Sequence, residues 1–233
     1  MELNGVKLTW LGHSTFRIET PGGKTLLIDP WVMGNPMCPE KEKTIKKLDV
    51  MLCTHGHFDH IGDAVQICKR NNPTVVGIFE LCNWLEKKGA KMISPMNKGG
   101  SQAVDDIRVT MVHADHSCGI LDGDQIIYGG EPCGYVIEFK NGLKIYHAGD
   151  TNVFGDMQII RELYAPDIVM LPIGDLYTMS PREAAYACKL LQPKFVVPMH
   201  FGTFPPLTGK PSELRRLAKD VEIIEMQPGQ TLT

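Results

Sequence analysis

The sequence predicts an α/β fold class, and three observations support it. Short apolar strand candidates alternate with helix candidates in the first half of the chain. The second half begins with strands again, so two strand-rich halves carry helices at intervals. The hydrophobic content, 43% of 233 residues, can supply the core of one larger domain spanning residues 1–233. These observations fit two mixed β-sheets packed face to face with helices outside, although pattern alone leaves the topology open.

The first half is predicted to open with three strands. The run Pro21-Gly22-Gly23-Lys24 indicates a hairpin turn between the second and third, because the glycine spacing of a phosphate-binding loop is missing. Further strands then alternate with helices, as in layered α/β proteins. The predicted strands cover residues 6–10, 16–19, 25–28, 74–78 and 91–93, with one more near Val50, and the predicted helices cover residues 62–70 and 80–88.

The second half is predicted to begin with a strand, a glycine-rich stretch and a hairpin that turns at Asn141-Gly142. A later helix has Ser180 as its cap and Pro181 at its first position, a combination favoured at helix starts. The strands are expected at residues 107–112, 134–139, 143–146, 167–171, 194–199 and 221–224, the glycine-rich stretch at 117–132, and the helices at 156–163, 180–191 and 211–219.

Composition limits the function classes. A formal net charge of −3, with lysine and arginine scattered, disfavours broad nucleic-acid binding, which needs a concentrated basic face. No long apolar run is present in the sequence, so we expect neither secretion nor a membrane span. The seven cysteines include no Cys-x-x-Cys pair and predict free thiols in a reducing cytoplasm. Oligomeric state cannot be predicted here, and a homo-oligomer stays open.

The densest cluster of chemically active residues follows the apolar run 50–53. Here His55, His57, Asp59 and His60 fall within six residues. Residues two apart on extended chain point the same way, so the first two histidines can hold one ion together. Asp59 and His60 fall at the turn into the next predicted helix, where they can serve a second ion. Imidazole and carboxylate at this density are ligand chemistry for zinc and similar metals, rather than a histidine-rich surface loop.

Three more strands are predicted to end in potential ligands. The strand at 107–112 runs into His113 and His116, the strand at 143–146 into His147 and Asp150, and the strand at 194–199 into His200. Sites in layered α/β proteins collect at the loops beyond strand ends. Any one of these histidines alone would more often be structural, but four such strand ends in one chain predict a common cleft.

These motifs together resemble the metallo-β-lactamase superfamily of binuclear metallohydrolases. The resemblance rests on His-x-His-x-Asp-His at 55–60, a later histidine, Ala-Gly-Asp-Thr at 148–151 and a last strand-end histidine, and it covers nearly the whole chain. The phrases at 12–16, 114–117 and 198–203 are similar to an uncharacterised metal-dependent hydrolase branch, near the ascorbate-phosphate lactonases and the N-acyl-phosphatidylethanolamine phospholipase D enzymes. The resemblance implies a four-layer αββα sandwich.

The resemblance also implies a ligand scheme for two divalent metal ions. Zinc is the first choice, and Mn²⁺, Fe²⁺ and Ni²⁺ also suit such ligands. A metal-bridging hydroxide would be the nucleophile, and a site with a net formal charge of about +1 would favour an anionic substrate. The scheme assigns His55, His57 and His116 to one ion, Asp59, His60 and His200 to the other, and Asp150 to the bridge between them.

Four further residues are candidates for supporting roles. His113 is an alternative third ligand. If His116 is the ligand, His113 is a residue that supports the ligands, a proton donor that would join Asp59 as a catalytic residue, or simply a structural histidine. The resemblance places a carboxylate that orients a ligating histidine at Asp29, although a simple turn before proline also fits there. His13 is expected to line the cleft without being a ligand. His147 is expected to be a buried structural histidine rather than a catalytic one.

The function predicted from the sequence is a cytoplasmic binuclear metallohydrolase that acts on a small ester, lactone or phosphodiester. An RNA-processing nuclease is one alternative, but it would ordinarily bring a basic arm or an inserted domain. A non-catalytic metal-binding protein is another, because ligands establish binding and not turnover. A diiron redox protein would carry glutamate in place of a motif histidine, and His57 argues against it.

Overall fold

The computed structural model describes residues 2–233. Their strands are β1 (Lys7–Trp10), β2 (Phe16–Glu19), β3 (Thr25–Ile28), β4 (Val50–Leu52), β5 (Thr74–Ile78), β6 (Met92–Met96), β7 (Ser101–Val104), β8 (Ile107–His113), β9 (Gly119–Asp122), β10 (Gln125–Tyr128), β11 (Cys133–Phe139), β12 (Lys144–His147), β13 (Ile168–Pro172), β14 (Phe195–Met199), β15 (Glu222–Ile223) and β16 (Thr231–Leu232). Their helices are α1 (Phe58–Ile61), α2 (Ala64–Asn71), α3 (Phe79–Lys87), α4 (Met157–Tyr164), α5 (Pro181–Leu191) and α6 (Pro211–Leu217), with a 3₁₀ turn at Glu40–Glu42.

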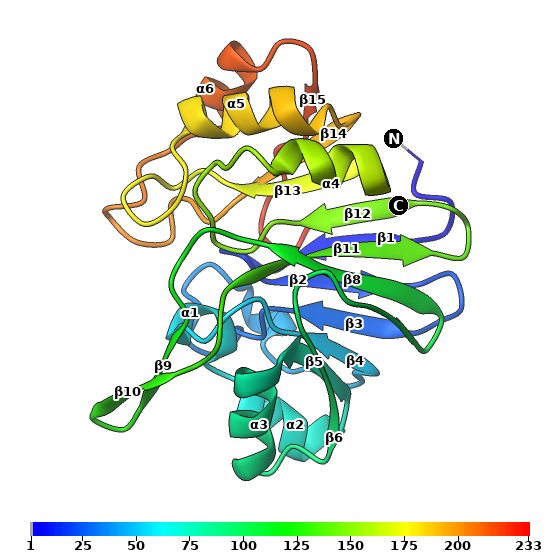
Figure 1. The fold of residues 1–233 in the computed structure, drawn as a ribbon, viewed down its shortest axis with the longest axis vertical. Coiled ribbons are helices and arrows are strands. Elements are labelled where there is room, and N and C mark those ends of the chain that lie inside the picture. Colours follow the sequence, from blue (N-terminus) through cyan, green and yellow to red (C-terminus); the bar gives the residue numbers. More distant parts are fainter. Residues whose placement is uncertain (1) are drawn as a thin grey trace.

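Two large mixed sheets form the centre of the molecule (Figure 1). The first has the order β16-β1-β2-β3-β4-β5-β6 and the second the order β15-β14-β13-β12-β11-β8-β7. Pairing changes from antiparallel to parallel at β3–β4 in one sheet and at β12–β13 in the other. The two sheets therefore share the same plan, and the predicted α/β class with two mixed sheets is confirmed.

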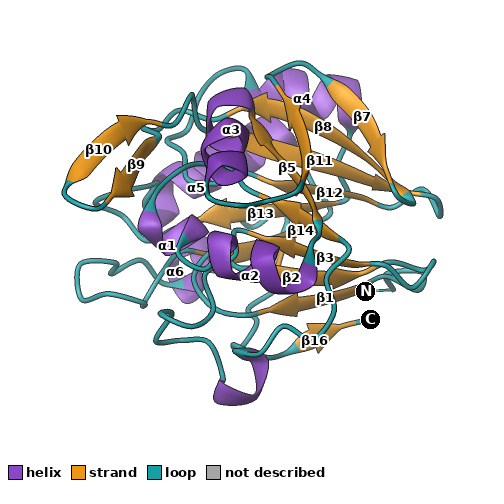
Figure 2. Ribbon diagram, turned by 90° about the horizontal axis from the view of Figure 1, so that it is seen from below, coloured by secondary structure: helices purple, strands orange, loops and turns teal. Residues whose placement is uncertain are grey.

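The central strands of the second sheet are buried on both faces. Successive residues of a strand point to opposite sides. In β13, Ile168 and Met170 accordingly pack in the core between the sheets, while Val169 and Leu171 pack in a second core beneath the outer helices. Figure 2 shows helices on both outer faces of the sheet pair. The layers are thus helix, sheet, sheet and helix.

Most predicted elements are present with boundaries shifted by one or two residues. Helix α5 begins as expected: Ser180 accepts a hydrogen bond from the Glu183 backbone N–H, the Glu183 side chain bonds back to the Ser180 N–H, and Pro181 follows. No strand was predicted in the glycine-rich stretch at 117–132, but it contains the hairpin β9–β10. Its turn contains Gly123 in a left-handed conformation followed by Asp124, a recognised hairpin signal.

Within residues 2–233, no helix combines the length and apolar character needed to cross a bilayer. The predicted strand at 221–224 shortens to β15, and β7 and β16 were not predicted. Both missed strands lie at sheet edges, where little of a strand is covered and the hydrophobic pattern is weak.

All seven cysteines are free and buried, which yields a first prediction. Burial raises the pKa of the Cys68 and Cys118 thiols to about 11 and that of Cys82 to about 12, so few thiolates form near neutral pH. We expect iodoacetamide at pH 7.5 to label almost none of the cysteines in the folded chain and all seven after unfolding in guanidinium chloride. Mass spectrometry counts the labels. Fast labelling of several thiols in the folded chain would contradict this packing.

Candidate metal centre

The candidate site lies where strands of both sheets end. β4 leads to His55, β8 to His116, β12 to Asp150 and β14 to His200. Strands β8, β12 and β14 run in one direction within their sheet, as do β1, β3 and β4 in theirs. Their carboxyl ends therefore meet at a common edge, which is where sites form in open α/β sheets.

Three histidines make the first possible cation site. Ligand atoms of His55, His57 and His116 all lie within 4.8 Å of one another. His55 Nε2 is 3.0 Å from His57 Nδ1, and the outer nitrogen of His57 is 3.3 Å from the Ser117 hydroxyl. His55 is fully buried, whereas the other two are partly exposed at the pocket. The arrangement presents three ring nitrogens to one point.

A second group combines histidine with carboxylate. Ligand atoms of His13, Asp59, His60 and His200 lie within 4.8 Å of one another. His13 was expected to line the cleft, but the structure places it in this cluster, with Nε2 3.0 Å from Asp59 Oδ2 and its ring 3.9 Å from that of His200. Its Nδ1 lies 2.8 Å from the hydroxyl of Thr203. His13 therefore holds Asp59 in place and lies within ligand distance of the same point.

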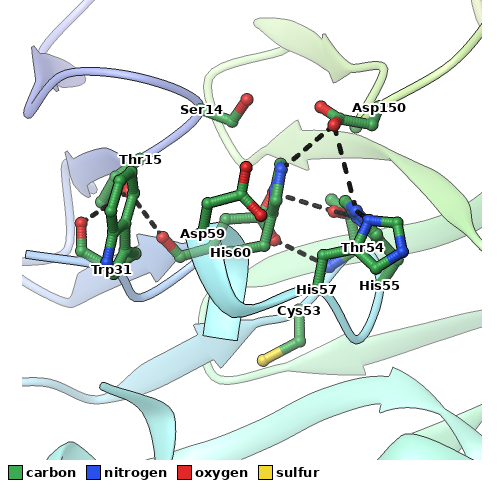
Figure 3. A network of polar contacts seen from close by, with 12 residues as sticks. Ser14, Thr15, Trp31, Cys53, Thr54, His55, His57, Asp59, His60 and Asp150 are labelled. Atoms are coloured by element: carbon green, nitrogen blue, oxygen red, sulfur yellow. Dashed lines mark hydrogen bonds and ion pairs between the residues drawn. The ribbon is translucent and has the colours of Figure 1, made fainter. Parts of the chain in front are cut away.

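Asp150 lies between the two groups (Figure 3). Its Oδ2 is 2.9 Å from His200 Nε2 and 3.2 Å from His60 Nε2 on one side. On the other side the same oxygen is 3.7 Å from His116 Nε2 and 4.0 Å from His55 Nε2. One carboxylate oxygen thus faces nitrogens from both histidine groups, which is the position that a bridging ligand needs.

Asp29 fixes the orientation of two histidines from beneath the cluster. It is fully buried, and its Oδ2 accepts hydrogen bonds from His60 Nδ1 at 2.7 Å and from the Thr54 hydroxyl at 2.8 Å. Because that hydroxyl proton points to Asp29, Thr54 Oγ1 accepts from His55 Nδ1 at 3.0 Å. Both rings consequently donate from Nδ1 and turn Nε2 toward Asp150. Sequence reasoning missed Thr54, although its place directly before the histidine motif is the signal that could have found it.

The charges of the cluster are strongly coupled. Burial lowers the pKa of His60, but Asp150 and Asp29 outweigh burial and raise it well above its ordinary value. Burial, assisted by His60, lowers the pKa of His55 well below its ordinary value. Burial raises the pKa of Asp150, but His200 and His60 outweigh that effect and hold it well below normal. The pocket thus keeps Asp150 ionised and His55 neutral, as cation ligands require, whereas the proton that the two carboxylates favour on His60 would have to leave when a cation binds.

The residues present fit divalent cations. Among residues 2–233, His60 Nε2, His200 Nδ1 and Asp150 Oδ1 are buried side-chain atoms without a hydrogen-bond partner. Buried polar atoms are normally paired, so this concentration of unpaired ligand atoms indicates a missing partner. Histidine nitrogens with carboxylate oxygens form the donor set that zinc prefers.

Backbone strain also collects here. His13, Asp29 and His200 have φ angles of 54°, 51° and 55°, in the left-handed region that residues other than glycine seldom occupy. Such strain persists only where the surrounding structure imposes it, and it is concentrated at functional sites. For His200 the support includes a hydrogen bond from its backbone N–H to the carbonyl of His13 at 3.1 Å.

His113 and His147 lie apart from the cluster. His113 is exposed at the end of β8, with Nδ1 3.4 Å from Lys98 Nζ and its ring 4.8 Å from that of Phe154. His147 is fully buried, donates from Nε2 to the Ser14 carbonyl and accepts at Nδ1 from the Gly149 N–H. Of the two histidines after β8, His116 is the one that reaches the ligand cluster.

A pocket of about 730 Å³ opens above the ligands. Asp59, His116, Asp150 and His200 form part of its floor, and most of its walls are apolar. The hairpin β9–β10 forms one wall. The loop that follows His200 contributes further lining residues.

Residues 7–200 match the model of a family described as the beta-lactamase superfamily domain. The chain belongs to this superfamily. Superfamily membership agrees with the two mixed sheets and with the convergence of strand-end ligands, because both depend on the same topology.

Similar proteins are described as metal-dependent hydrolases. A UPF0173 metal-dependent hydrolase from Koribacter versatilis is 65% identical over 231 residues, covering 99% of each chain. Another from Solibacter usitatus is 54% identical, covering 97% of this chain and 98% of its own. Among solved structures, Igni18, a metallo hydrolase from the archaeon Ignicoccus hospitalis, is 39% identical with a TM-score of 0.85, and the match covers 97% of both chains. The predicted metallo-β-lactamase-like fold is confirmed.

Proposed function

We propose that this metal-dependent hydrolase of the beta-lactamase superfamily holds two divalent cations, zinc by preference, and hydrolyses a small molecule between them. His55, His57 and His116 would hold one ion. Asp59, His60 and His200 would hold the other, with Asp150 shared. The proposal rests on one observation above all: Asp150 Oδ2 lies within 4.0 Å of imidazole nitrogens from both groups.

Such cations, when bound, lower the pKa of coordinated water toward about 7 and polarise the group under attack. The chain itself supplies orientation and proton handling. Asp59 is 15% exposed and lines the pocket, so its carboxylate can accept a proton from attacking water as well as bind a cation. His13 Nε2, 3.0 Å from Asp59 Oδ2, keeps that carboxylate in place.

The ester, lactone and phosphodiester classes all suit this arrangement. Each is hydrolysed when water adds to an electrophilic centre and an oxygen leaving group departs. Carboxylate and imidazole donors with mostly apolar walls provide a site for a substrate of modest size. A cytoplasmic location agrees with seven free, buried thiols, and it remains part of the proposal.

A matched pair of histidine variants tests the ligand scheme. His116→Ala is expected to lower the bound metal by about one ion per chain and kcat/KM by roughly 10³-fold, because a catalytic cation contributes several kcal/mol to the transition state. His113→Ala removes a histidine from the exposed end of the same strand and should leave the metal content unchanged. Elemental analysis and hydrolysis assays give both readings. Metal loss in the His113 variant alone would overturn the assignment.

A further inference from the structure

The hairpin β9–β10 presents an unusual apolar face. Leu121 and Ile126 are directly paired across its two strands and share one face. They are 59% and 79% exposed, and both line the pocket above the ligand cluster. A large apolar pair left open to solvent is disfavoured unless it meets a partner. This face is therefore a candidate binding surface within the site.

The other face of the hairpin is anchored to the body of the protein. Ile120 is buried against Gly56, at a position where a Cβ on that glycine would come within 2.5 Å of it. Asp122 accepts hydrogen bonds from Trp84 Nε1 at 2.9 Å and from Lys88 Nζ at 2.7 Å. These contacts hold the hairpin in place although it extends away from the sheets (Figure 1). The exposed pair is thus a fixed wall.

Other parts of the pocket lining are apolar as well. Phe58, Phe204 and Leu207 also line the pocket, and the Phe58 and Phe204 rings lie 6.4 Å apart at their centroids. The Phe204 ring is stacked at 5.8 Å on Trp31, which holds it in place. A chain of methylene groups entering the pocket would contact apolar carbon of the hairpin and of these residues.

The pocket offers little to a phosphorylated substrate. Of its lining residues, all within the described part of the chain, none is a lysine or an arginine. Side-chain recognition of a phosphate group ordinarily uses one of these cations. The ionised side chains of the lining are the carboxylates Asp59 and Asp150, which the proposed cations would offset, so positive charge would lie only at the ligand cluster and not along the walls. The anionic substrate expected from the sequence thus has no cationic side chain to meet it in the walls.

We propose that the site takes a carboxylic ester with a hydrophobic acyl chain and that Leu121 and Ile126 bind this chain. The inference rests on the proposed hydrolase function and specifies its substrate class. Water adds to the carbonyl carbon, the bond from that carbon to the alcohol oxygen breaks, and the alcohol leaves with a proton. The products are the fatty acid and the alcohol, so no further reactant is needed. The acyl chain lies along the hairpin while its carbonyl reaches the ligand cluster.

Hydrolysis of 4-nitrophenyl acetate, butyrate and octanoate by the metal-loaded enzyme tests the proposal. A fully buried methylene contributes about fourfold. Because the pocket is half open, we expect kcat/KM to rise at least about 30-fold from acetate to octanoate. In the double variant Leu121→Ser/Ile126→Ser, kcat/KM for octanoate should fall about tenfold while that for acetate stays within about twofold. Equal losses for both esters would contradict a chain-binding role.

The control is Tyr128→Ser. Tyr128 is 71% exposed on the same hairpin face, but it does not line the pocket, so the dependence on chain length should persist. Binding of octanoate and acetate, measured by calorimetry, provides a reading independent of turnover. Octanoate should bind the parent enzyme more tightly, and the double variant should lose that preference.

The outcomes separate the two proposals. Hydrolysis of bis(4-nitrophenyl) phosphate without dependence on acyl length would overturn the inference and leave the hydrolase proposal standing. Absence of hydrolysis for every compound would contradict the proposed function. If, in addition, octanoate bound no more tightly than acetate, the proposal that Leu121 and Ile126 bind the acyl chain would be wrong as well.

Discussion

Asp150→Ala is expected to abolish hydrolysis and to leave no more than one bound metal ion per chain. The carboxylate is 3% exposed, and its Oδ2 faces nitrogens of both histidine groups, so its loss removes a ligand from each proposed ion at once. It also removes the anion that offsets the charge of two cations at close range. We expect kcat/KM to fall by at least about 10³-fold. Elemental analysis and the hydrolysis assay measure both effects.

Asp115→Asn provides the matched control. Asp115 lies on the loop before His116 but is exposed, and its side chain contacts only the Asn152 amide, at 3.4 Å, among the described residues. Removal of that charge should change neither metal content nor turnover appreciably. Full metal loading in the Asp150 variant would mean that each histidine group binds its cation without Asp150. The assignment of Asp150 as a shared ligand would then be wrong.

Asp29→Asn is expected to lower metal affinity about 10- to 100-fold, the usual effect of losing the partner of a ligating histidine. The amide keeps the shape of the side chain and tolerates the left-handed backbone at this position. However, Asp29 uses both oxygens as acceptors, Oδ1 for the Thr54 backbone N–H at 2.8 Å and Oδ2 for the Thr54 hydroxyl and His60 Nδ1. The NH₂ group of the amide cannot accept, so whichever way the amide is turned at least one of these donors loses its acceptor. Buried donors left unpaired should also cost about 3 kcal/mol in the free energy of unfolding. Competition with a chromogenic chelator and urea denaturation measure the two quantities.

A variant of a second buried carboxylate distinguishes the loss of metal affinity from the loss of stability. Asp63 is 6% exposed, and its Oδ2 accepts the backbone N–H groups of Val32 and Met33 at 2.7 Å each. Asp63→Asn should therefore destabilise the fold by a similar amount while metal affinity stays unchanged. If both variants lost metal equally, Asp29 would be a general stabilising residue and not a positioning one.

Much of the candidate site could be predicted from the sequence, because several of its ligands lie close together along the chain. Four potential ligands within residues 55–60 signal a metal site without any knowledge of the fold. Hydrophobic runs directly before them predicted strands, and strand ends predicted convergence. The choice between His113 and His116 stayed open, because both follow the same strand and only the path of the loop separates them.

Other parts depend on contacts between distant segments. The role of Thr54 requires Asp29, which lies 25 positions earlier, and the place of His13 requires Asp59, which lies 46 positions later. Neither relation leaves a periodic signal. The hairpin β9–β10 was missed for a different reason: its exposed Leu121 and Ile126 do not follow the alternation of a half-buried strand, because they face a pocket and not the core.

The central claim is that two cations share Asp150. Anomalous diffraction at the zinc edge from crystals of the zinc-loaded protein tests it most directly. We expect two peaks about 3.5–4 Å apart, one beside His55, His57 and His116, the other beside Asp59, His60 and His200, with the Asp150 carboxylate between them. A single peak, or peaks away from these side chains, would contradict the account.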